Sequence, residues 1–349
     1  MPSDKPVTII GGGLAGLTLG IALRRRGVPV VIWEAGGYPR HRVCGEFISG
    51  RGVAVLERLE LLEPCRAAGA FTAHTARFFL GAGRSPVRTL AAPALCLSRH
   101  ALDALLAETF QRLGGDLRAG RRWTAPLAQA GVVCATGRRV SATERGPRWF
   151  GVKAHVASGQ TMKLEADLEM HVSRNGYVGV NRIGGGEVNV CGLLRRDGTG
   201  PRLESKADWL RGEPGSTLRA RLEGRAFDPA SFCSVAGLDL RPQQAIARAE
   251  CCLGDALTLT PPVTGNGMSM AFESAEIAAG PLAAYSAGQG DWSTARRAIA
   301  RGCDAAFGRR LAWARRLQWM LLSPVLRGRV GARLLGSEWL WDFLYARTR

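Results

Sequence analysis

The chain has 349 residues, enough for one large domain or two joined ones, and 46% of them are hydrophobic, which suits a globular core. Its formal net charge of +18 favours an anionic partner such as a membrane surface or nucleic acid, although a general arginine bias would give the same excess. No apolar run reaches the roughly 18 residues of a spanning helix, and the nine cysteines form no CxxC pair, which argues against a zinc or iron–sulfur site.

The first forty residues follow one order of elements. Val7–Ile10 is predicted to form a buried strand, Gly11–Gly16 a glycine turn, Leu14–Arg25 a helix and Val30–Glu34 a second strand. Strand, glycine turn, helix, strand and acid is the layout of a dinucleotide-binding βαβ unit. A signal peptide is the alternative for an apolar start, but here the basic run 24–26 follows the apolar stretch instead of preceding it.

Each glycine of this turn has a physical role in such a unit. Gly11 permits the tight turn, Gly13 lets the backbone approach a pyrophosphate, and Gly16 lets the helix lie against the strand. The N–H groups and positive dipole end of the helix then face the phosphates. Glu34 follows Gly16 by 18 residues, close to the spacing of about 20 expected of an acid that binds ribose hydroxyls.

The next segments alternate between loops, helices and strands. A loop rich in basic and turn residues, 38–46, can bring arginine to a pyrophosphate. It is followed by a predicted helix at Gly50–Leu61 and by strands within residues 71–97. Ser98 is placed to cap a helix that runs from about residue 100 to residue 113.

From residue 150 the hydrophobic period changes to two. Residues 164–172 alternate between apolar and polar, which predicts a half-buried strand. Asn175-Gly176 is a strong hairpin signal, and Gly184–Gly186 closes another turn. Residues 150–194 are therefore expected to form an antiparallel sheet. Two histidines on these strands are interpreted as structural polar residues, His155 and His171.

The C-terminal half returns to the pattern of the first forty residues. After a short buried strand at Val132–Ala135 and the inserted sheet, residues 245–272 hold a second short strand that leads into Gly254-Asp255. The loop 261–267 then opens a helix from residue 268 to about residue 285. A glycine loop that opens a helix offers a second dipole to a ligand between the two glycine sites.

Residues 295–349 carry half of the net charge, with 12 arginines against 3 acids. Apolar residues recur there at helical spacing, and four tryptophans are spread over the segment. Arginine and tryptophan on amphipathic helices suit a membrane interface. A terminal layer of helices that covers the core explains the same pattern.

With both glycine sites in view, the chain resembles FAD-dependent oxidoreductases of the glutathione-reductase-like fold. Within them it is similar to the aromatic hydroxylase (p-hydroxybenzoate hydroxylase-like) and geranylgeranyl reductase group. Four matches carry the resemblance: Gly11–Gly16 with Glu34, Arg42-Val-Cys-Gly-Glu46, Ser98-Arg99 with Leu102-Asp103, and Gly254-Asp255 … Pro261-Pro262 … Gly265-x-Gly267-Met268. The fourth is specific, because a simple NAD-dependent dehydrogenase has no reason to carry it. Residues 1–285 follow the family order.

The resemblance implies a role for individual residues. Glu34 would hold the adenosine ribose, Arg99 would lie near the pyrophosphate and ribityl chain, and Asp255 would accept a hydrogen bond from a ribityl hydroxyl. Gly267 and Met268 would present backbone N–H groups to the N1/C2 edge of the flavin. The implied FAD-binding set is Gly11, Gly13, Leu14, Ala15, Gly16, Glu34, Arg42, Cys44, Gly45, Arg99, Gly254, Asp255, Pro262, Gly265, Gly267 and Met268.

The resemblance also implies that the stretch Cys44-Gly45-Glu46 lies near the isoalloxazine, between cofactor and substrate. Glu46 is the candidate catalytic residue, because a carboxyl group in a partly apolar pocket can have a raised pKa and handle a proton. The alternative is that Glu46 is a loop ion-pair partner of Arg42. No metal site is expected.

Three features depart from the family or from its halogenating branch. Ala135-Thr136-Gly137 stands where family members usually carry Ala-Asp-Gly, and the missing aspartate weakens the case for direct use of NAD(P)H. Only 18 residues separate Leu113 from Val132, which leaves little room for the small β-meander of many relatives. The absence of a Trp-x-Trp-x-Ile-Pro stretch, and of lysine between residues 6 and 152, argues against a flavin-dependent halogenase.

The expected fold is α/β, with an FAD-binding Rossmann domain, an inserted antiparallel substrate sheet and a helical C-terminus. The expected boundaries are 1–70, 98–148 and 245–290 for the FAD-binding domain, 71–97 and 149–244 for the substrate domain, and 291–349 for the C-terminal helices.

The expected function is flavin monooxygenation of an apolar or aromatic small molecule, with FAD as cofactor and NAD(P)H as a candidate reductant. The alternative is reduction of isoprenoid double bonds. A weaker alternative is a non-catalytic membrane or nucleic-acid binding module on this scaffold. We expect a cytoplasmic protein that contacts the inner face of a membrane through its basic C-terminus, and we do not expect nucleic acid as the partner.

Overall fold

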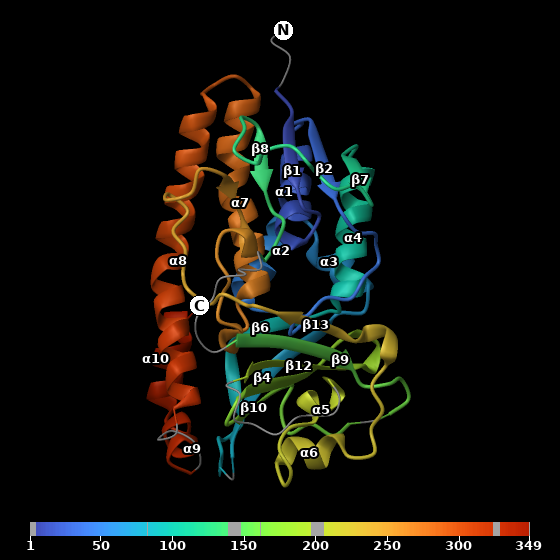
Figure 1. Cartoon of the computed structure of the whole chain (residues 1–349), viewed down its shortest axis with the longest axis vertical. Helices are drawn as coiled ribbons and strands as arrows, with labels where there is room; N and C mark the ends of the chain where they lie inside the picture. Colours follow the sequence, from blue (N-terminus) through green and yellow to red (C-terminus); the bar gives the residue numbers. More distant parts are fainter. Residues whose placement is uncertain are drawn as a thin grey trace.

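The computed structural model describes residues 5–81, 83–138, 148–160, 162–196, 206–323 and 329–348. Figure 1 shows two units stacked along the long axis of the molecule, with long helices running down one side of both. The helices are α1 (Leu14–Arg24), α2 (Gly50–Arg58), α3 (Leu62–Ala67), α4 (Arg99–Arg112), α5 (Lys206–Arg211), α6 (Thr217–Leu222), α7 (Gly267–Ser286), α8 (Trp292–Leu322), α9 (Arg329–Leu335) and α10 (Glu338–Thr348).

Fourteen strands are assigned within the described residues. They are β1 (Val7–Ile10), β2 (Val30–Glu34), β3 (Phe47–Ile48), β4 (Phe71–Leu80), β5 (Gly83–Arg84), β6 (Arg88–Cys96), β7 (Asp116–Ala119), β8 (Val132–Cys134), β9 (Arg148–His155), β10 (Leu168–Ser173), β11 (Gly176–Arg182), β12 (Val188–Arg196), β13 (Cys233–Ala236) and β14 (Cys251–Cys252).

The upper unit is built on a five-stranded parallel sheet in the order β14-β8-β1-β2-β7. The predicted βαβ unit is confirmed: β1 and β2 pair in parallel from Val7↔Val30 to Ile10↔Trp33, and α1 connects them, ending one residue earlier than expected. Helix α1 packs against α4 and α7, so that its sides are buried between neighbouring helices and the sheet. The carboxyl ends of these strands point toward the lower unit (Figure 1).

The segment between α4 and β8 is compact, as expected. Ser98 caps α4 by accepting a hydrogen bond from the Ala101 N–H group at 3.1 Å, and the helix begins at Arg99. All of residues 113–132 are described, and they hold a single strand, β7, which joins the edge of the parallel sheet. The chain therefore has no β-meander at this place.

The lower unit is built on a nine-stranded sheet in the order β13-β9-β12-β11-β10-β4-β6-β3, with β5 paired to β4. Strands from residues 71–97 and from residues 148–236 join in this one sheet. The sheet is mixed and not purely antiparallel, because β10 pairs with β4 in parallel, from Leu168↔Ala76 to Val172↔Leu80.

One strand of the predicted sheet differs from the expectation. The strand expected at 164–172 starts only at Leu168, and it is buried on both faces. Arg221 of α6 contacts Glu169, and His171 contacts Glu169 and stacks on Phe79. An alternation of apolar and polar residues predicts a solvent-exposed face only where no other element covers that face of the strand. The hairpin predicted at Asn175-Gly176 is confirmed: β10 and β11 pair antiparallel, and Ser173 pairs with Gly176, so that Arg174 and Asn175 are the turn residues.

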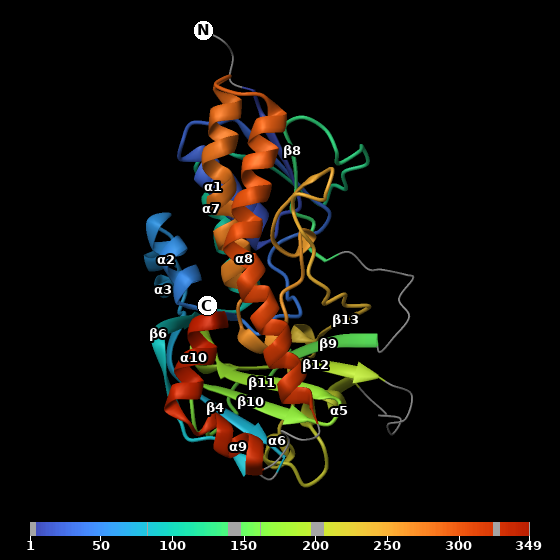
Figure 2. The same ribbon diagram turned by 90° about the vertical axis from the view of Figure 1, so that its left-hand side faces the viewer.

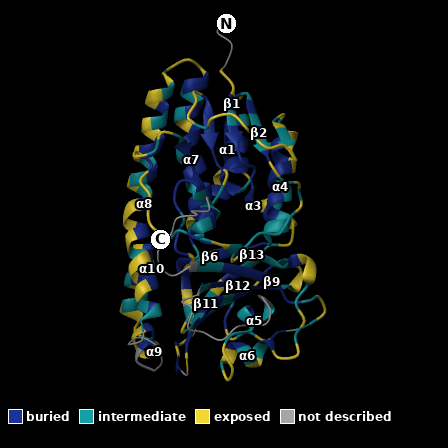
Figure 3. Cartoon of the chain, viewed as in Figure 1, coloured by how far each residue is buried: buried dark blue, intermediate teal, exposed yellow. Residues whose placement is uncertain are grey.

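The C-terminal helices form a layer along both units (Figure 2). Helix α8 packs on α7 in the upper unit and continues down to β10, where α10 packs against it. Its inner face is buried and its outer face is exposed, as Figure 3 shows. None of the helices in the described ranges is long and apolar enough to cross a membrane.

Candidate functional site

The first glycine loop has the geometry that nucleotide binding requires. Gly11 has φ +108°, and a Cβ atom there would lie 2.3 Å from the Ala135 carbonyl oxygen of the neighbouring strand. A Cβ at Gly16 would lie 1.9 Å from the Gly11 carbonyl oxygen, so helix and loop touch there. A Cβ at Gly13 would meet nothing within 4 Å, and Gly13 borders the main cavity. The loop is therefore tightly packed at Gly11 and Gly16, and it has open space only at Gly13, on the side of the cavity.

Glu34 ends β2 and is buried beneath this loop. Its carboxylate accepts hydrogen bonds from the Gly12 N–H group at 2.8 Å and from Arg40 Nη1 at 2.8 Å. Burial alone would raise the pKa of Glu34, but the hydrogen bond from Arg40 and the N–H group of Gly36 hold it below its ordinary value. An ionised carboxylate at the edge of the cavity fits the expected acceptor for ribose hydroxyls.

Arg99 at the start of α4 and Arg42 of the loop 38–46 both lie near one buried acid, Asp103. Arg99 Nε and Nη2 donate to both oxygens of Asp103 at 2.7 and 2.8 Å, one turn further along the helix. Arg42 Nε lies 3.8 Å from the same carboxylate, and its Nη2 lies 3.9 Å from Glu34. Both arginines line the cavity. The bidentate pair fixes the plane of the Arg99 guanidinium, which leaves a positive surface toward a bound anion.

The second glycine loop faces the same cavity from the other side. Gly265 has φ +65° and ends a short turn, and α7 begins two residues later at Gly267. Gly267 and Met268 line the cavity, so the free N–H groups of the first helical turn border it. A 20-residue helix that starts there directs its positive dipole end toward the cavity.

Asp255 is the acid of this second loop, and its carboxylate faces the cavity without a hydrogen-bond partner among the described residues. Burial raises the pKa of Asp255, and the charges of Arg138 and Arg99 oppose this rise only in part. A desolvated acceptor without a protein donor is suited to a ligand hydroxyl.

Replacing Asp255 by alanine is expected to weaken FAD binding by about 10- to 100-fold, since a hydrogen bond to a charged group contributes about 1.5–3 kcal/mol. Quenching of flavin fluorescence on titration of FAD into apoprotein measures this affinity. Asp116→Ala, at an exposed acid of β7 that does not line the cavity, is the matched control. An unchanged affinity in Asp255→Ala would show that Asp255 does not touch the cofactor.

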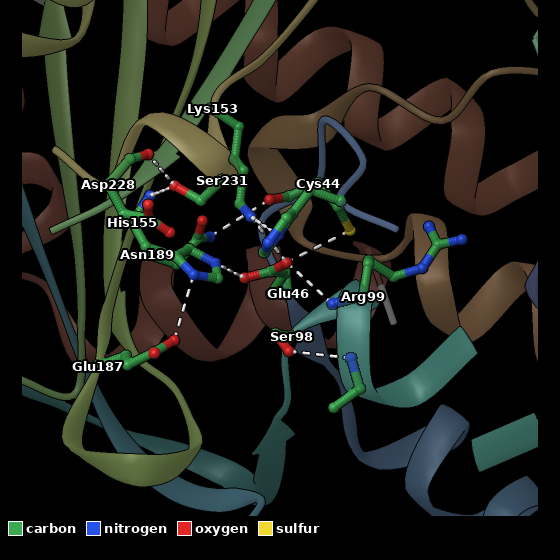
Figure 4. Close-up of polar contacts among 12 residues, drawn as sticks. Cys44, Glu46, Ser98, Arg99, Lys153, His155, Glu187, Asn189, Asp228 and Ser231 are labelled. Carbon is green, nitrogen blue, oxygen red and sulfur yellow. Dashed lines mark hydrogen bonds and ion pairs between the residues drawn. The ribbon is translucent and has the colours of Figure 1, made fainter. Parts of the chain in front are cut away.

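The loop after Arg42 carries the most densely connected acid of the site, Glu46 (Figure 4). Its side chain is fully buried, and its backbone has φ +52°, an uncommon conformation outside glycine. The Oε1 atom of Glu46 accepts from the backbone N–H group of Arg99 at 2.9 Å and lies 3.2 Å from Lys153 Nζ. Its Oε2 atom lies 2.7 Å from His155 Nε2. Glu46 therefore connects the loop 38–46 to α4 and to strand β9.

Two expectations for Glu46 are wrong. Burial alone would raise its pKa, but the hydrogen bond from His155 and the charge of Lys153 hold it below its ordinary value. Its ion-pair partner is Lys153 and not Arg42, which lies beside Glu34 and Asp103. The sequence alone could not indicate this partner, because the register of β9 against the loop is a tertiary contact.

His155 and His41 complete the cluster. His155 was expected to be only structural, yet its imidazole contacts Glu46, which lines the cavity. His41, Glu46 and His155 hold one ligand atom each within 4.8 Å of one another, a spacing that a metal ion could use. Lys153 Nζ, however, lies 3.2 Å from both His41 Nδ1 and Glu46 Oε1. Burial and this ammonium lower the pKa of His41 to about 4. The Lys153 ammonium thus supplies the positive charge that a metal ion would bring to this cluster.

All these groups border or support one cavity of about 460 Å³. The expected FAD-binding residues that line it are Gly13, Leu14, Ala15, Glu34, Arg42, Cys44, Gly45, Arg99, Asp255, Pro262, Gly265, Gly267 and Met268. Gly11, Gly16 and Gly254 do not line it and instead shape the turns behind it. Thr136 lines the cavity at the place where family members usually carry an aspartate.

The far end of the cavity is apolar, and sequence reasoning missed the residues that close it. Phe78, Met170 and Tyr177 of the lower sheet face Trp341 and Leu344 of α10 there. Other members of this wall are Leu168, Leu193, Leu317, Leu335, Tyr345 and Thr348. The spacing 341, 344, 345 and 348 marks one helical face, which could have indicated a buried side of α10 but not what it covers.

The chain's similarity to known proteins agrees with this geometry. Residues 4–148 match a family model described as an FAD binding domain. The matched residues include β1, β2, β7 and β8 of the parallel sheet and β3–β6 of the lower sheet. The open space at Gly13, the Asp255 carboxylate, which has no hydrogen-bond partner within the described ranges, and the start of α7 all fit FAD as the cofactor. No curated protein matches the chain by sequence.

Solved structures of flavin enzymes have the same fold along almost the whole chain. The flavin-dependent brominase Bmp2 is 18% identical with a TM-score of 0.75, covering 99% of this chain and 93% of its own. PqsL from Pseudomonas aeruginosa, a probable FAD-dependent monooxygenase, is 18% identical with a TM-score of 0.69, covering 97% and 99%. The myxobacterial chondrochloren halogenase CndH is 17% identical with a TM-score of 0.73, covering 100% and 91%. The expected fold, an FAD-binding domain with an inserted sheet and a helical C-terminus, is thus confirmed.

Proposed function

We propose that this protein is an FAD-dependent monooxygenase that hydroxylates an apolar or aromatic small molecule. The observation that carries the proposal is the continuity of the cavity: one end is bordered by both glycine loops and the other by apolar and aromatic side chains. Bound FAD supplies the redox chemistry and the activation of O₂. Such a cavity places an apolar substrate against the flavin and excludes water from it.

The chain's own residues have distinct tasks in this proposal. Gly13 and the start of α1 accommodate the pyrophosphate, and Glu34 and Asp255 accept hydrogen bonds from ribose and ribityl hydroxyls. The N-terminus of α7 stabilises negative charge on the flavin edge through its N–H groups and dipole. Glu46 is the candidate proton-handling residue at the cavity wall. NAD(P)H is the reductant to be tested, although Thr136 offers no carboxylate for it.

Reduction of an isoprenoid double bond is the second candidate function. Cys44, Gly45 and Glu46 match the reductase branch, and all three line the cavity beside Arg99. The apolar end contains no charged side chain among its wall residues on the lower sheet and α10, which also suits a prenyl chain.

Two assays separate these functions. FAD-loaded protein with a reductant is given a panel of small aromatic compounds while O₂ is recorded, and products are identified by mass. A monooxygenase consumes O₂ in step with formation of a product heavier by one oxygen atom. A reductase acts on prenyl substrates without O₂ and adds two hydrogens. Purified protein that binds no FAD would contradict both functions.

We further propose that the C-terminal helices contact an anionic membrane surface. Trp319 and Trp339 are each 73% exposed, although a buried position would be normal for such large apolar rings. Trp339 stacks on Phe343 at 5.5 Å, and Phe343 meets Trp313 edge-on at 5.3 Å. Arg316 lies over Trp313, and Trp319 follows it by three residues on α8, on a neighbouring part of the helix surface.

Replacing both exposed tryptophans by alanine is expected to weaken binding to vesicles that contain anionic phosphatidylglycerol by about tenfold or more, because each ring would lose apolar burial at the interface. Binding of the unchanged protein should also fall as salt increases. Co-sedimentation measures both effects, with Ile246→Ala as an exposed control outside these helices. Equal binding to neutral and anionic vesicles would contradict the proposal.

A further inference from the structure

The buried cluster around Glu46 has an outlet to solvent. His155 lies between two carboxylates: its Nε2 atom is 2.7 Å from Glu46 Oε2, and its Nδ1 atom is 3.2 Å from Glu187 Oε2. We propose that Glu46, His155 and Glu187 form a relay that carries protons between the flavin cavity and solvent (Figure 4). This relay rests on the proposed flavin chemistry, which takes up and releases protons at the cavity.

The inner end of the relay borders the cavity. Glu46 is one of the residues that line the cavity, its side chain is fully buried, and its Oε2 atom is directed to His155. The other carboxylate oxygen is held by the Arg99 N–H group and Lys153. The two oxygens thus have separate partners, so that one holds the carboxylate in place while the other can exchange a proton with the imidazole.

The middle of the relay is rigid. His155 is the last residue of β9, its N–H group donates to Ser231 Oγ at 2.8 Å, and its carbonyl oxygen accepts from the Asp228 N–H group at 3.0 Å. Both ring nitrogens lie within the reach of about 2.6–3.2 Å at which a side chain can transfer a proton. An imidazole can accept a proton at one nitrogen and release one from the other, which suits a bridge between two carboxylates.

The outer end reaches water. Glu187 follows the Gly184–Gly186 turn between β11 and β12, and its side chain is 39% exposed, in contrast to the buried side chains of Glu46 and His155. The lower sheet holds a second buried histidine–glutamate pair, but that pair reaches neither the cavity nor solvent. His171 contacts Glu169, but both side chains are buried and neither lines the cavity.

One proton enters the relay for each proton that leaves it. A proton from solvent binds Glu187 and passes to Nδ1 of His155, while the proton on Nε2 passes to Glu46 and then into the cavity. The reverse order carries a proton out, and no electron moves in either direction. The fixed charge in contact with the relay is the ammonium of Lys153 on the same strand, and the uncharged backbone N–H group of Arg99 also donates to Glu46.

The neighbouring titratable groups do not provide a second path. His41 packs edge-on against His155 at 5.2 Å and stacks on His100 at 4.6 Å, but its Nδ1 atom faces the Lys153 ammonium. Cys44 Sγ accepts from the Glu46 N–H group at 3.4 Å, and burial raises the pKa of this thiol. Within the described residues, the route through His155 is the one that joins the cavity to an exposed acid.

The relay predicts a specific defect in Glu187→Gln. Glutamine keeps an oxygen that can accept from His155 but cannot carry a proton, so FAD affinity and stability should not change. FAD-loaded protein is photoreduced without O₂ and mixed with O₂ in a stopped-flow instrument, where return of the flavin absorbance is followed over pH in dilute buffer. Reoxidation by O₂ to hydrogen peroxide consumes one proton from solvent for each anionic reduced flavin.

We expect reoxidation in Glu187→Gln and His155→Asn to be about tenfold slower than in the unchanged protein, with a new dependence on buffer concentration and a larger solvent isotope effect. A high concentration of imidazole buffer should restore the rate. Glu213→Gln, an exposed acid elsewhere in the lower unit that accepts from the Arg174 N–H group, is the matched control. Rates, buffer dependence and isotope effects equal to those of the unchanged protein would overturn the relay, whereas protein without flavin absorbance would overturn the proposed function itself.

Discussion

Gly13→Ser is expected to weaken FAD binding by at least about 100-fold while the apoprotein stays folded. Gly13 borders the cavity, and a Cβ atom there would meet no protein atom within 4 Å, so the new side chain enters the space that the cofactor's pyrophosphate needs. The loss corresponds to roughly 3 kcal/mol of binding free energy.

The stability of this variant should not change for a separate reason. Gly13 is the N-cap residue of α1, with extended backbone angles (φ −90°, ψ −168°) and no side-chain cap. Serine is favoured over glycine at that position, because its hydroxyl can accept from the N–H groups of the first turn. The free energy of unfolding of the apoprotein should therefore stay within about 0.5 kcal/mol of the unchanged protein, or rise.

Gly16→Ala provides the contrasting control. Its Cβ atom would lie 1.9 Å from the Gly11 carbonyl oxygen, so this variant should lose several kcal/mol of stability as well as FAD. Flavin fluorescence titration and urea unfolding of the apoprotein measure the two quantities. FAD affinity in Gly13→Ser equal to that of the unchanged protein would place the pyrophosphate elsewhere.

The parts of the site that could be predicted from the sequence are those formed by local chain geometry. A turn such as 11–16 needs glycine at fixed spacing, and an acid such as Asp255 must follow its own strand, so both appear as short motifs. The same holds for the helix cap Ser98, whose hydroxyl oxygen accepts from the backbone N–H group only three residues further along the chain. Each of these features involves residues that are close in the chain.

The contacts that could not be predicted join distant parts of the chain. Glu46 contacts Lys153 and His155 only because β9, which lies more than 100 residues further along the chain, packs beside the loop 38–46. Trp341 and Tyr345 face the cavity because α8 carries the chain back along both units. Helical spacing indicates that such residues are buried, but not that they form the wall of a substrate pocket. For the same reason, the sequence alone suggested a raised pKa for Glu46, since its buried cationic neighbours were unknown.

The second large effect concerns the buried ion pair between Glu46 and Lys153. Glu46→Gln is expected to lower the free energy of unfolding by about 3–5 kcal/mol at pH 7, because it leaves the fully buried Lys153 ammonium without its counter-charge. The glutamine can still accept from the Arg99 N–H group and adopts the same backbone conformation. The cost therefore comes from the uncompensated charge and not from lost packing.

Adding Lys153→Met to Glu46→Gln should recover most of this loss, since the methionine fills a similar volume without a charge. Urea unfolding of the two single variants, the double variant and the unchanged protein yields the coupling energy of the pair, which we expect to be at least about 2 kcal/mol. Additive effects would show that the two side chains do not interact.

The loss in Glu46→Gln should also depend on pH in one direction. The folded state holds the pKa of Glu46 below its ordinary value of 4.5, so the carboxylate contributes its full stability above about pH 4.5. As the pH falls below that value, the unfolded chain takes up a proton at this residue before the folded chain does, and the contribution declines. The difference between Glu46→Gln and the unchanged protein should thus be constant near neutral pH and shrink in acid. A difference that grows on acidification would mean that Glu46 is protonated in the folded state and that Lys153 is not its counter-ion.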